Sequence, residues 1–154
     1  MTVELVGTAE HTLQSQRFAT LYAQAQQFYA DQMRILDAHD TERWTRTFTE
    51  DALVALPSLA EPLPVRAALA HYARTGAARQ RQAGNRLDHW VGMLDVQPQA
   101  DGSLHTRCSA LVYVTPDGAG AKALHVCVME DVLVRAADGG WRTARRRVTR
   151  DDLA

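Results

Sequence analysis

The sequence predicts an α+β fold, with three helices in the first half of the chain and an antiparallel sheet in the second half. Apolar residues recur at helical spacing through most of residues 16–82 and alternate with polar residues through most of residues 87–149. Helices gathered before a run of strands are typical of α+β domains and not of wound parallel sheets. A long helix packed on a curved sheet leaves a concave space, and small-molecule sites often form in such spaces.

The first helix is expected over residues 16–36, because its apolar residues fall three and four positions apart and no Gly or Pro interrupts them. Residues 1–14 have no sustained period, so we expect a flexible arm there and a single domain over residues 15–154. Polar residues then break the helical pattern. Asp40 is well placed to cap a short second helix that contains Trp44.

Five strands complete the predicted fold. A short strand lies between the second and third helices, and four longer strands joined by turns rich in Gly and Asp follow the third helix. In sequence order we expect a strand at residues 52–56, a loop at 57–64, a helix at 65–82, and strands at 87–94, 104–115, 124–135 and 141–149. Consecutive strands with such short connections favour antiparallel pairing. We therefore expect a four-stranded meander with one further short strand.

Composition argues against several classes of function. The chain has 154 residues with 17 basic and 18 acidic side chains, and its net charge of −1 gives no electrostatic basis for binding nucleic acid or an anionic membrane. No apolar run approaches the roughly 18 residues of a membrane span, and the first residues lack the blocks of a signal peptide. We therefore expect a cytoplasmic protein. Sixteen of the basic residues are Arg, a bias typical of GC-rich genomes such as those of actinobacteria.

Cofactor chemistry has no support in the sequence. Cys108 and Cys127 are too few for a disulfide scaffold and lack the spacing of zinc ligands. There is no glycine-rich phosphate loop, no His-x-x-x-His pair and no nucleophile elbow. We expect neither a cofactor nor a metal.

Three segments resemble the nuclear transport factor 2-like (NTF2-like), or SnoaL-like, superfamily. In residues 33–52 a helix ends in Leu-Asp, a short helix carries Trp, and Phe-Thr-Glu-Asp-Ala enters a strand. The second segment is the His-bearing strand Asp88-His-Trp-Val-Gly92, and the third comprises the last two strands over residues 130–151. The resemblance covers roughly residues 16–151. It implies a cone in which the three N-terminal helices pack on a curved, mostly antiparallel sheet that encloses a pocket.

Within this superfamily the sequence is most similar to small actinomycete proteins of aromatic polyketide pathways. That similarity implies an antibiotic-biosynthesis enzyme, a cyclase or dehydratase, that acts on an aromatic polyketide intermediate by acid–base chemistry. The first segment also resembles the small subunit of ring-hydroxylating dioxygenases, which implies a non-catalytic accessory or binding module. Because one fold hosts many functions, both hypotheses stay open. Family members commonly form homodimers through the open sheet face, so a homodimer is expected as well.

His89 and Asp37 are the first candidates for acid–base chemistry. Strand alternation places His89, with Met93, on the face expected to point into the cone. An imidazole in an apolar cavity can act as a general acid or base. Scytalone dehydratase, a member of the superfamily, has an Asp at the place of Asp37 that orients a histidine, so the resemblance implies an Asp37–His89 pair. The alternatives are a core histidine and a turn-stabilising aspartate.

Further candidates surround the same space. The strand face that carries His125 is either interior or exterior, and alternation alone does not decide between them. An interior face would bring His125 to His89, and the hydroxyl of Tyr113 is a candidate donor to a developing oxyanion. The residues expected to bind substrate or line its pocket are Tyr22, Tyr29, Trp44, Met93 and His71.

Two other groups of residues are expected to be structural. Asp131 and Arg146 are expected to form an ion pair that joins two strands. Trp90 and Trp141 are expected to serve sheet packing or an interface. The basic run at residues 142–150 alternates between strand faces, so we expect a solvated edge and not a nucleic-acid surface.

Overall fold

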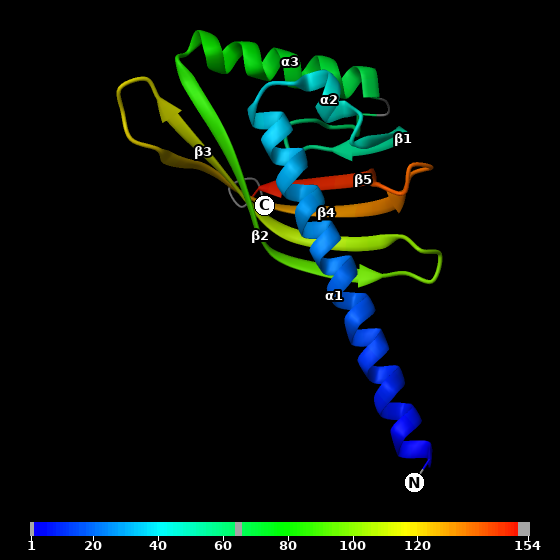
Figure 1. Cartoon of the computed structure of the whole chain (residues 1–154). Coiled ribbons are helices and arrows are strands. Elements are labelled where there is room, and N and C mark those ends of the chain that lie inside the picture. The colour runs from blue at the N-terminus through cyan, green and yellow to red at the C-terminus, as the bar shows by residue number, and fades with distance from the viewer. Residues whose placement is uncertain (1, 64–65, 151–154) are drawn as a thin grey trace.

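The computed structural model describes residues 2–63 and 66–150, without the side chains of residues 2–5 and 67. Within these ranges it contains three helices and five strands (Figure 1). They are α1 (Thr2–Asp37), α2 (Thr41–Thr45), β1 (Phe48–Ala55), α3 (Arg66–Gln82), β2 (Asn85–Pro98), β3 (Leu104–Pro116), β4 (Lys122–Arg135) and β5 (Trp141–Arg150). The predicted α+β fold class and the predicted order of elements are confirmed. None of the described helices combines the length and apolar character needed to cross a membrane.

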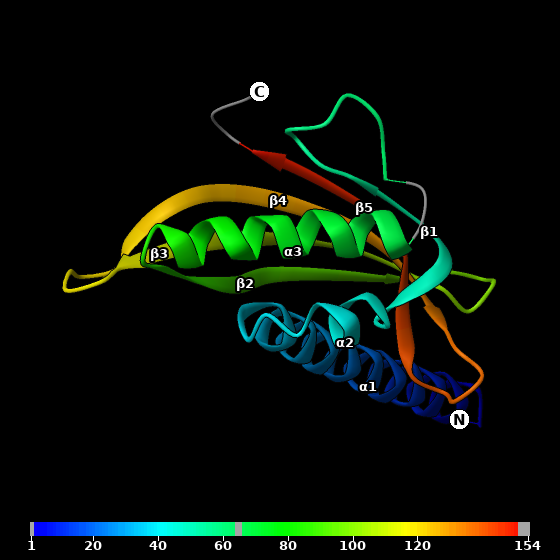
Figure 2. The same ribbon diagram turned by 90° about the horizontal axis from the view of Figure 1, so that it is seen from above.

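The five strands form one sheet in the order β1-β5-β4-β3-β2. The last four strands make the expected antiparallel meander, whereas β1 pairs with β5 in parallel at the far edge. Figure 1 shows α1 crossing in front of the sheet and α3 lying across its upper end. Seen from above, α3 lies between β1 and β5 on one side and α1 and α2 on the other (Figure 2). The three helices therefore enclose one side of the curved sheet.

Two clusters of buried side chains hold the helices to the sheet. In the first, Tyr29 and Met33 of α1 pack against residues of β2 to β5. In the second, Trp44 and Phe48 pack with Leu69 of α3, and the Trp44 and Phe48 rings meet edge to face with centroids 5.1 Å apart. Burying an apolar side chain of this size contributes about 1.5–3 kcal/mol. These clusters therefore fix the helices over the inner face of the sheet.

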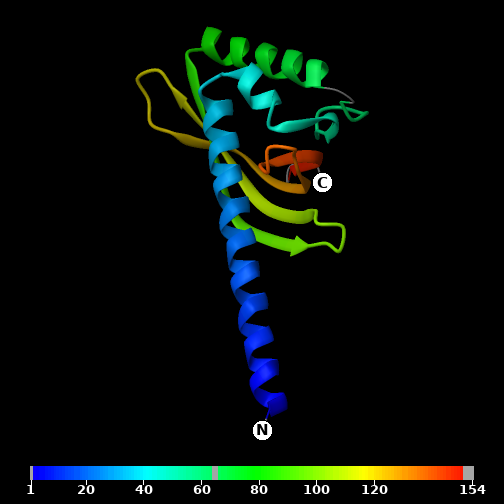
Figure 3. The ribbon, with the colours of Figure 1, turned by 45° about the vertical axis from the view of Figure 1, so that its right-hand side comes forward.

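The first helix is longer than expected. It begins at Thr2, so residues 2–14, where a flexible arm was predicted, are helical. Figure 3 shows this half of α1 extending beyond the sheet, and residues 6–20 are all exposed. Because nothing covers this part of the helix, its sequence carries no apolar stripe, and hydrophobic periodicity could not reveal it.

Two strands differ from their predicted bounds by four residues at one end, whereas the other three differ by one or two. β1 begins at Phe48 because this residue pairs with Thr143 of β5, a long-range contact that local sequence does not report. β2 continues to Pro98 through a bulge between Gly92 and Asp95, where Met93 takes a φ of +53°. The bulge breaks the alternation, and Met93 is 87% exposed. The prediction that Met93 points into the cone is therefore wrong.

The loop and third helix follow the prediction over the described residues. Residues 57–63 form no helix or strand beyond a bridge from Leu63 to Val54, and α3 begins at Arg66. The expected loop end at Pro64 and helix start at Val65 lie outside the described residues, as does the end of the third family-like segment.

The structure decides which face of β4 is interior. Cys127, Met129 and Asp131 are buried, whereas Leu124 and Val126 are 44% and 45% exposed. The His125 face is therefore the one that meets the helices. Of the two tryptophans assigned to packing or an interface, Trp141 is buried in the core and Trp90 is 67% exposed.

Candidate active site

An apolar pocket of about 270 Å³ lies between the helices and the inner face of the sheet. All three helices and all five strands contribute to its wall, and aliphatic, aromatic and sulfur-containing side chains make up most of it. A cavity of about 150 Å³ is enough to bind benzene, so this pocket has room for roughly two fused rings. Its few polar groups decide what chemistry it can support.

Asp37 and His89 meet at the wall of this pocket. Asp37 is the last residue of α1, and His89 lies on β2, which packs against that helix. The Oδ1 atom of Asp37 is 2.6 Å from Nδ1 of His89, and Oδ2 accepts the backbone N–H of His89 at 2.9 Å. The carboxylate therefore holds both the ring and the strand. The side chains of Asp37 and His89 are 20% and 22% exposed.

This contact defines the tautomer of a neutral His89. An ionised carboxylate only accepts hydrogen bonds, so Nδ1 carries the proton that it shares with Asp37. Nε2 then has a free lone pair and can accept a proton from a bound molecule. The carboxylate also stabilises the imidazolium that such a transfer would form. The geometry is that of an oriented general base.

Trp44 and His39 add polar groups to the same pocket. Trp44 borders the pocket as expected, and its Nε1 atom is buried without a hydrogen-bond acceptor among the described residues. His39 lies between α1 and α2 and also borders the pocket. His39 was not among the predicted site residues, although its position two residues after Asp37, in a break between helices, was a usable signal.

Among the residues of α3 that border the pocket, the polar one is Tyr72; the predicted His71 is exposed and does not border the pocket. The Tyr72 hydroxyl is 3.1 Å from the Ser58 hydroxyl. Tyr72 follows Leu69 by three positions and precedes Gly76 by four, and all three border the pocket. This helical spacing was the signal that pointed to Tyr72 and away from His71.

The other predicted catalytic residues are not brought to His89. His125 is half-buried on the interior face of β4, opposite Val112, but does not border the pocket. Tyr113 lies on the outer face of β3, where its ring contacts exposed Trp90 with centroids 6.2 Å apart. The expectation that Tyr113 faces the pocket is therefore wrong, because strand alternation places it on the opposite side from Val112.

Tyr22, Tyr29 and Met93 border a separate groove of about 350 Å³ between α1 and β2. Asp37 and His89 also border this groove, so the pair lies between the apolar pocket and the groove. The three residues were expected in the pocket itself, and the structure corrects that placement. The physical reason is that Tyr22 and Tyr29 lie on the part of α1 that faces the edge strand β2, and Met93 lies on β2 itself.

The hydroxyl of Tyr29 is part of a buried polar network. Its hydroxyl donates to Oδ2 of Asp131 at 2.9 Å and lies 2.5 Å from the Thr106 hydroxyl. Arg146 donates to both carboxylate oxygens of Asp131, at 2.9 and 2.6 Å, and to Gln32 at 2.5 Å. The predicted Asp131–Arg146 ion pair is therefore present and joins β4 to β5.

The network keeps its members in defined charge states. Burial and then the charge of Asp131 raise the pKa of Tyr29 far above its usual value, so the phenol stays protonated and donates. Burial alone would lower the pKa of Arg146, but Asp131 more than offsets it and the pKa is raised. Arg146 borders the apolar pocket as a paired cation, so the network supports the wall and leaves the reactive pair to Asp37 and His89.

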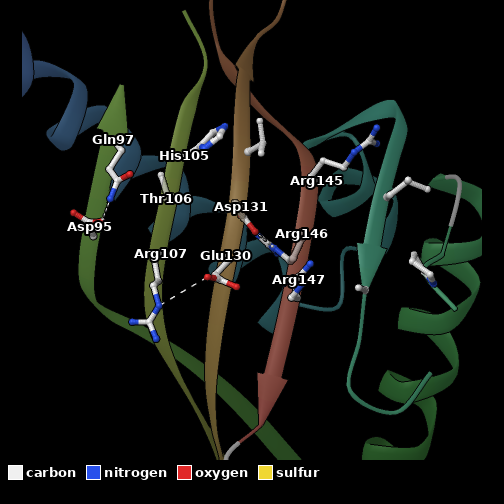
Figure 4. A pocket seen from close by; sticks show the side chains of 14 residues that line it. Asp95, Gln97, His105, Thr106, Arg107, Glu130, Asp131, Arg145, Arg146 and Arg147 are labelled. Carbon is white, nitrogen blue, oxygen red and sulfur yellow. Dashed lines mark hydrogen bonds and ion pairs between the residues drawn. The ribbon is translucent and has the colours of Figure 1, made fainter. Parts of the chain in front are cut away.

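A larger, polar hollow lies on the outer face of the sheet (Figure 4). It measures about 500 Å³ and is open. Figure 4 shows its labelled side chains on β2, β3, β4 and β5, with Arg107 directed at Glu130. The N–O distance of this pair is 4.0 Å. Although it is larger, the residues that line it include no hydrogen-bonded pair of a histidine and a carboxylate, and it is open, so the inner pocket is the better candidate site. Among the described residues no group of three or more His, Cys, Asp or Glu could hold a metal ion.

The fold is that of NTF2-like proteins, and its pocket is mostly apolar. Residues 17–147 match the SnoaL-like domain family. The chain belongs to this family. No curated protein matches the sequence.

Three solved structures are similar over most of their length. Aln2 from a Streptomyces species is 33% identical, over 87% of this chain and 93% of its own, with a TM-score of 0.80. ActVI-ORFA from Streptomyces coelicolor is 30% identical, over 86% of this chain and 98% of its own, with a TM-score of 0.78. A protein from Catenulispora acidiphila, solved in complex with S-DNPA, is 30% identical over 87% and 96%, with a TM-score of 0.75. That relative therefore holds a ligand on the same fold.

Proposed function

We propose that this protein is an acid–base enzyme of aromatic polyketide or related antibiotic biosynthesis that cyclises or dehydrates an intermediate in the inner pocket. The observation that carries the proposal is the Asp37–His89 pair at the wall of an otherwise apolar pocket. Membership of the SnoaL-like family supports the reaction class, because the sequence resembles SnoaL-type cyclases. A carboxylate that holds Nδ1 leaves Nε2 available to a substrate.

In a dehydration, Nε2 of His89 would remove a proton from the carbon next to a ketone. The electron pair of that C–H bond forms the new C=C bond, and the hydroxyl on the next carbon leaves as water after receiving a proton. In a cyclisation, the same proton removal generates the carbon nucleophile that attacks a carbonyl carbon. Asp37 would stabilise the imidazolium in both cases, and the apolar wall strengthens this interaction because it excludes water.

The test uses a bicyclic β-hydroxyketone, 3-hydroxy-1-tetralone, which loses one water to give 1-naphthol. Formation of naphthol by the purified protein is followed by its fluorescence. His89→Ala is expected to lower the rate at least 100-fold, because general acid–base groups contribute about 10²–10⁴. Asp37→Asn is expected to lower it as well, since the amide cannot stabilise the imidazolium.

His11→Ala is the matched control, because His11 is exposed on the projecting part of α1. It is expected to react at the wild-type rate. Turnover by His89→Ala at the rate of the wild type would contradict the proposal. Naphthol formation that is no faster with the wild-type protein than without protein would contradict it as well.

A binding or accessory module is the second candidate, and the apolar lining of the pocket favours it. Such a module would bind fused-ring compounds without converting them. His89→Ala would then leave the compounds recovered from the assay unchanged. Tight binding of the tetralone without turnover by either protein would select this second function over the first.

We also propose a homodimer that forms through the outer face of the sheet. Trp90, Leu111 and Val126 lie in register across β2, β3 and β4 on that face, and Trp90 and Val126 are exposed. Such an apolar row is unusual on a surface that stays in water. A monomer in multi-angle light scattering would contradict this expectation.

A further inference from the structure

His39 occupies an unusual backbone position at the end of α1. Its φ is +60°, in the left-handed region. The N–H of His39 donates to the carbonyl of Leu36 at 2.9 Å, and the N–H of Asp40 donates to that of Ile35 at 3.3 Å. This pair of bonds is the Schellman arrangement that closes a helix. Glycine usually holds the left-handed position, because other residues lose about 1–2 kcal/mol there.

The cap does not need an imidazole. Both capping bonds are made by the backbone, and a glycine would make them without the steric cost. Among the described residues, the ring nitrogens of His39 have no hydrogen-bond or ion-pair partner. The side chain of His39 therefore makes no contact at the helix end that would offset the energetic cost of its left-handed backbone conformation.

His39 is instead one of the residues that border the apolar pocket, together with Asp37 and His89, and it is only partly exposed. Trp44, at the same α1–α2 side of the pocket, has a buried Nε1 without an acceptor among the described residues. Two residues whose side chains can donate a hydrogen bond thus border a mostly apolar space. Non-glycine residues held in the left-handed region cluster at functional sites for this kind of reason.

We propose that His39 is a second substrate-binding imidazole, which forms a hydrogen bond with a ligand oxygen at the α1–α2 side of the pocket. The inference rests on the proposed function for the ligand class and extends it. The substrate is then a fused-ring compound that presents one oxygen to the helix side, near His39 and Trp44, and a reacting carbon to His89.

The test exploits the cap, because glycine suits the backbone of position 39. His39→Gly is expected to unfold at the wild-type temperature or slightly above it. Its dissociation constant for the probe 1,3-dihydroxynaphthalene, measured by calorimetry, is expected to rise about three- to tenfold, the effect of one lost hydrogen bond. His39→Asn, which tolerates the left-handed region and keeps a donor, is expected to restore part of the affinity. An unchanged dissociation constant for His39→Gly would overturn the proposal.

A second measurement separates this proposal from the proposed function. The imidazole Cε1–H resonances of the wild type are followed by NMR while the same probe is added, with His11 as the remote control. Shifts at His39 and His89 but not at His11 support both proposals. A shift at His89 alone overturns the role of His39 and leaves the pocket as the site. An absence of binding, with no shift at either residue, contradicts the proposed ligand class and His39 with it.

Discussion

Replacement of Arg146 by methionine is expected to destabilise the fold by about 3–5 kcal/mol. The side chains of Arg146 and Asp131 are only 4% and 0% exposed. Arg146 supplies two of the three side-chain hydrogen bonds that Asp131 accepts, and the hydroxyl of Tyr29 supplies the third. Methionine keeps most of the volume of Arg146 but leaves a buried carboxylate with one donor. The Gln32 oxygen loses its donor too.

Urea unfolding followed by circular dichroism measures this loss. With a slope of about 1–3 kcal/mol per molar urea, the midpoint is expected to fall by about 1 M or more. Arg142→Met is the matched control, because it breaks an exposed pair with Asp138, whose N–O distance is 2.8 Å. Exposed pairs contribute only about 0–1 kcal/mol, so this variant is expected to unfold close to the wild type.

The double variant Arg146→Met/Asp131→Leu distinguishes a lost attraction from an unpaired buried charge. It is expected to be more stable than Arg146→Met alone, because removal of both charges removes the desolvation cost. Unfolding of Arg146→Met at the same urea concentration as Arg142→Met would contradict the expected cost of an unpaired buried charge, and so would a double variant less stable than the single one.

Three further predictions concern the pocket, a thiol and a turn. Trp44→Phe removes an unpartnered N–H but also part of a buried ring, so we expect a modest loss of thermal stability and about three- to tenfold weaker binding of 1,3-dihydroxynaphthalene; equal binding would contradict a hydrogen bond to the ligand. Burial raises the pKa of Cys108 to about 12, so at pH 8 roughly one thiol in ten thousand is ionised, and a thiol-reactive disulfide reagent should label it only after unfolding. Gly84→Ala should cost at least about 1 kcal/mol in urea unfolding, since Gly84 has a φ of +69° and a Cβ would lie 2.7 Å from Asp117 Oδ2. Gly7→Ala, in the exposed helix, should instead stabilise by up to about 1 kcal/mol.

Local sequence patterns were enough to predict most of the fold. Helical spacing over residues 16–36 and alternation after residue 87 reflect which side chains are buried, so they reveal elements whose burial is regular. The exposed half of α1 has no buried face, and therefore left no such pattern. The parallel pairing of β1 with β5 depends on residues about 95 positions apart, Phe48 and Thr143, and no local pattern encodes it.

Only part of the candidate site, likewise, could be predicted from the sequence. Family-like motifs were enough to predict that Asp37 meets His89 and that Asp131 pairs with Arg146, because the charged and hydrogen-bonding groups of these motifs have fixed partners. Only the tertiary structure decided that His39 borders the pocket and that Met93 does not. The physical reason is that a bulge or a left-handed residue shifts a side chain to another face. The sequence can show that a regular period ends, as it does near His39, but not to which face the side chain is then turned.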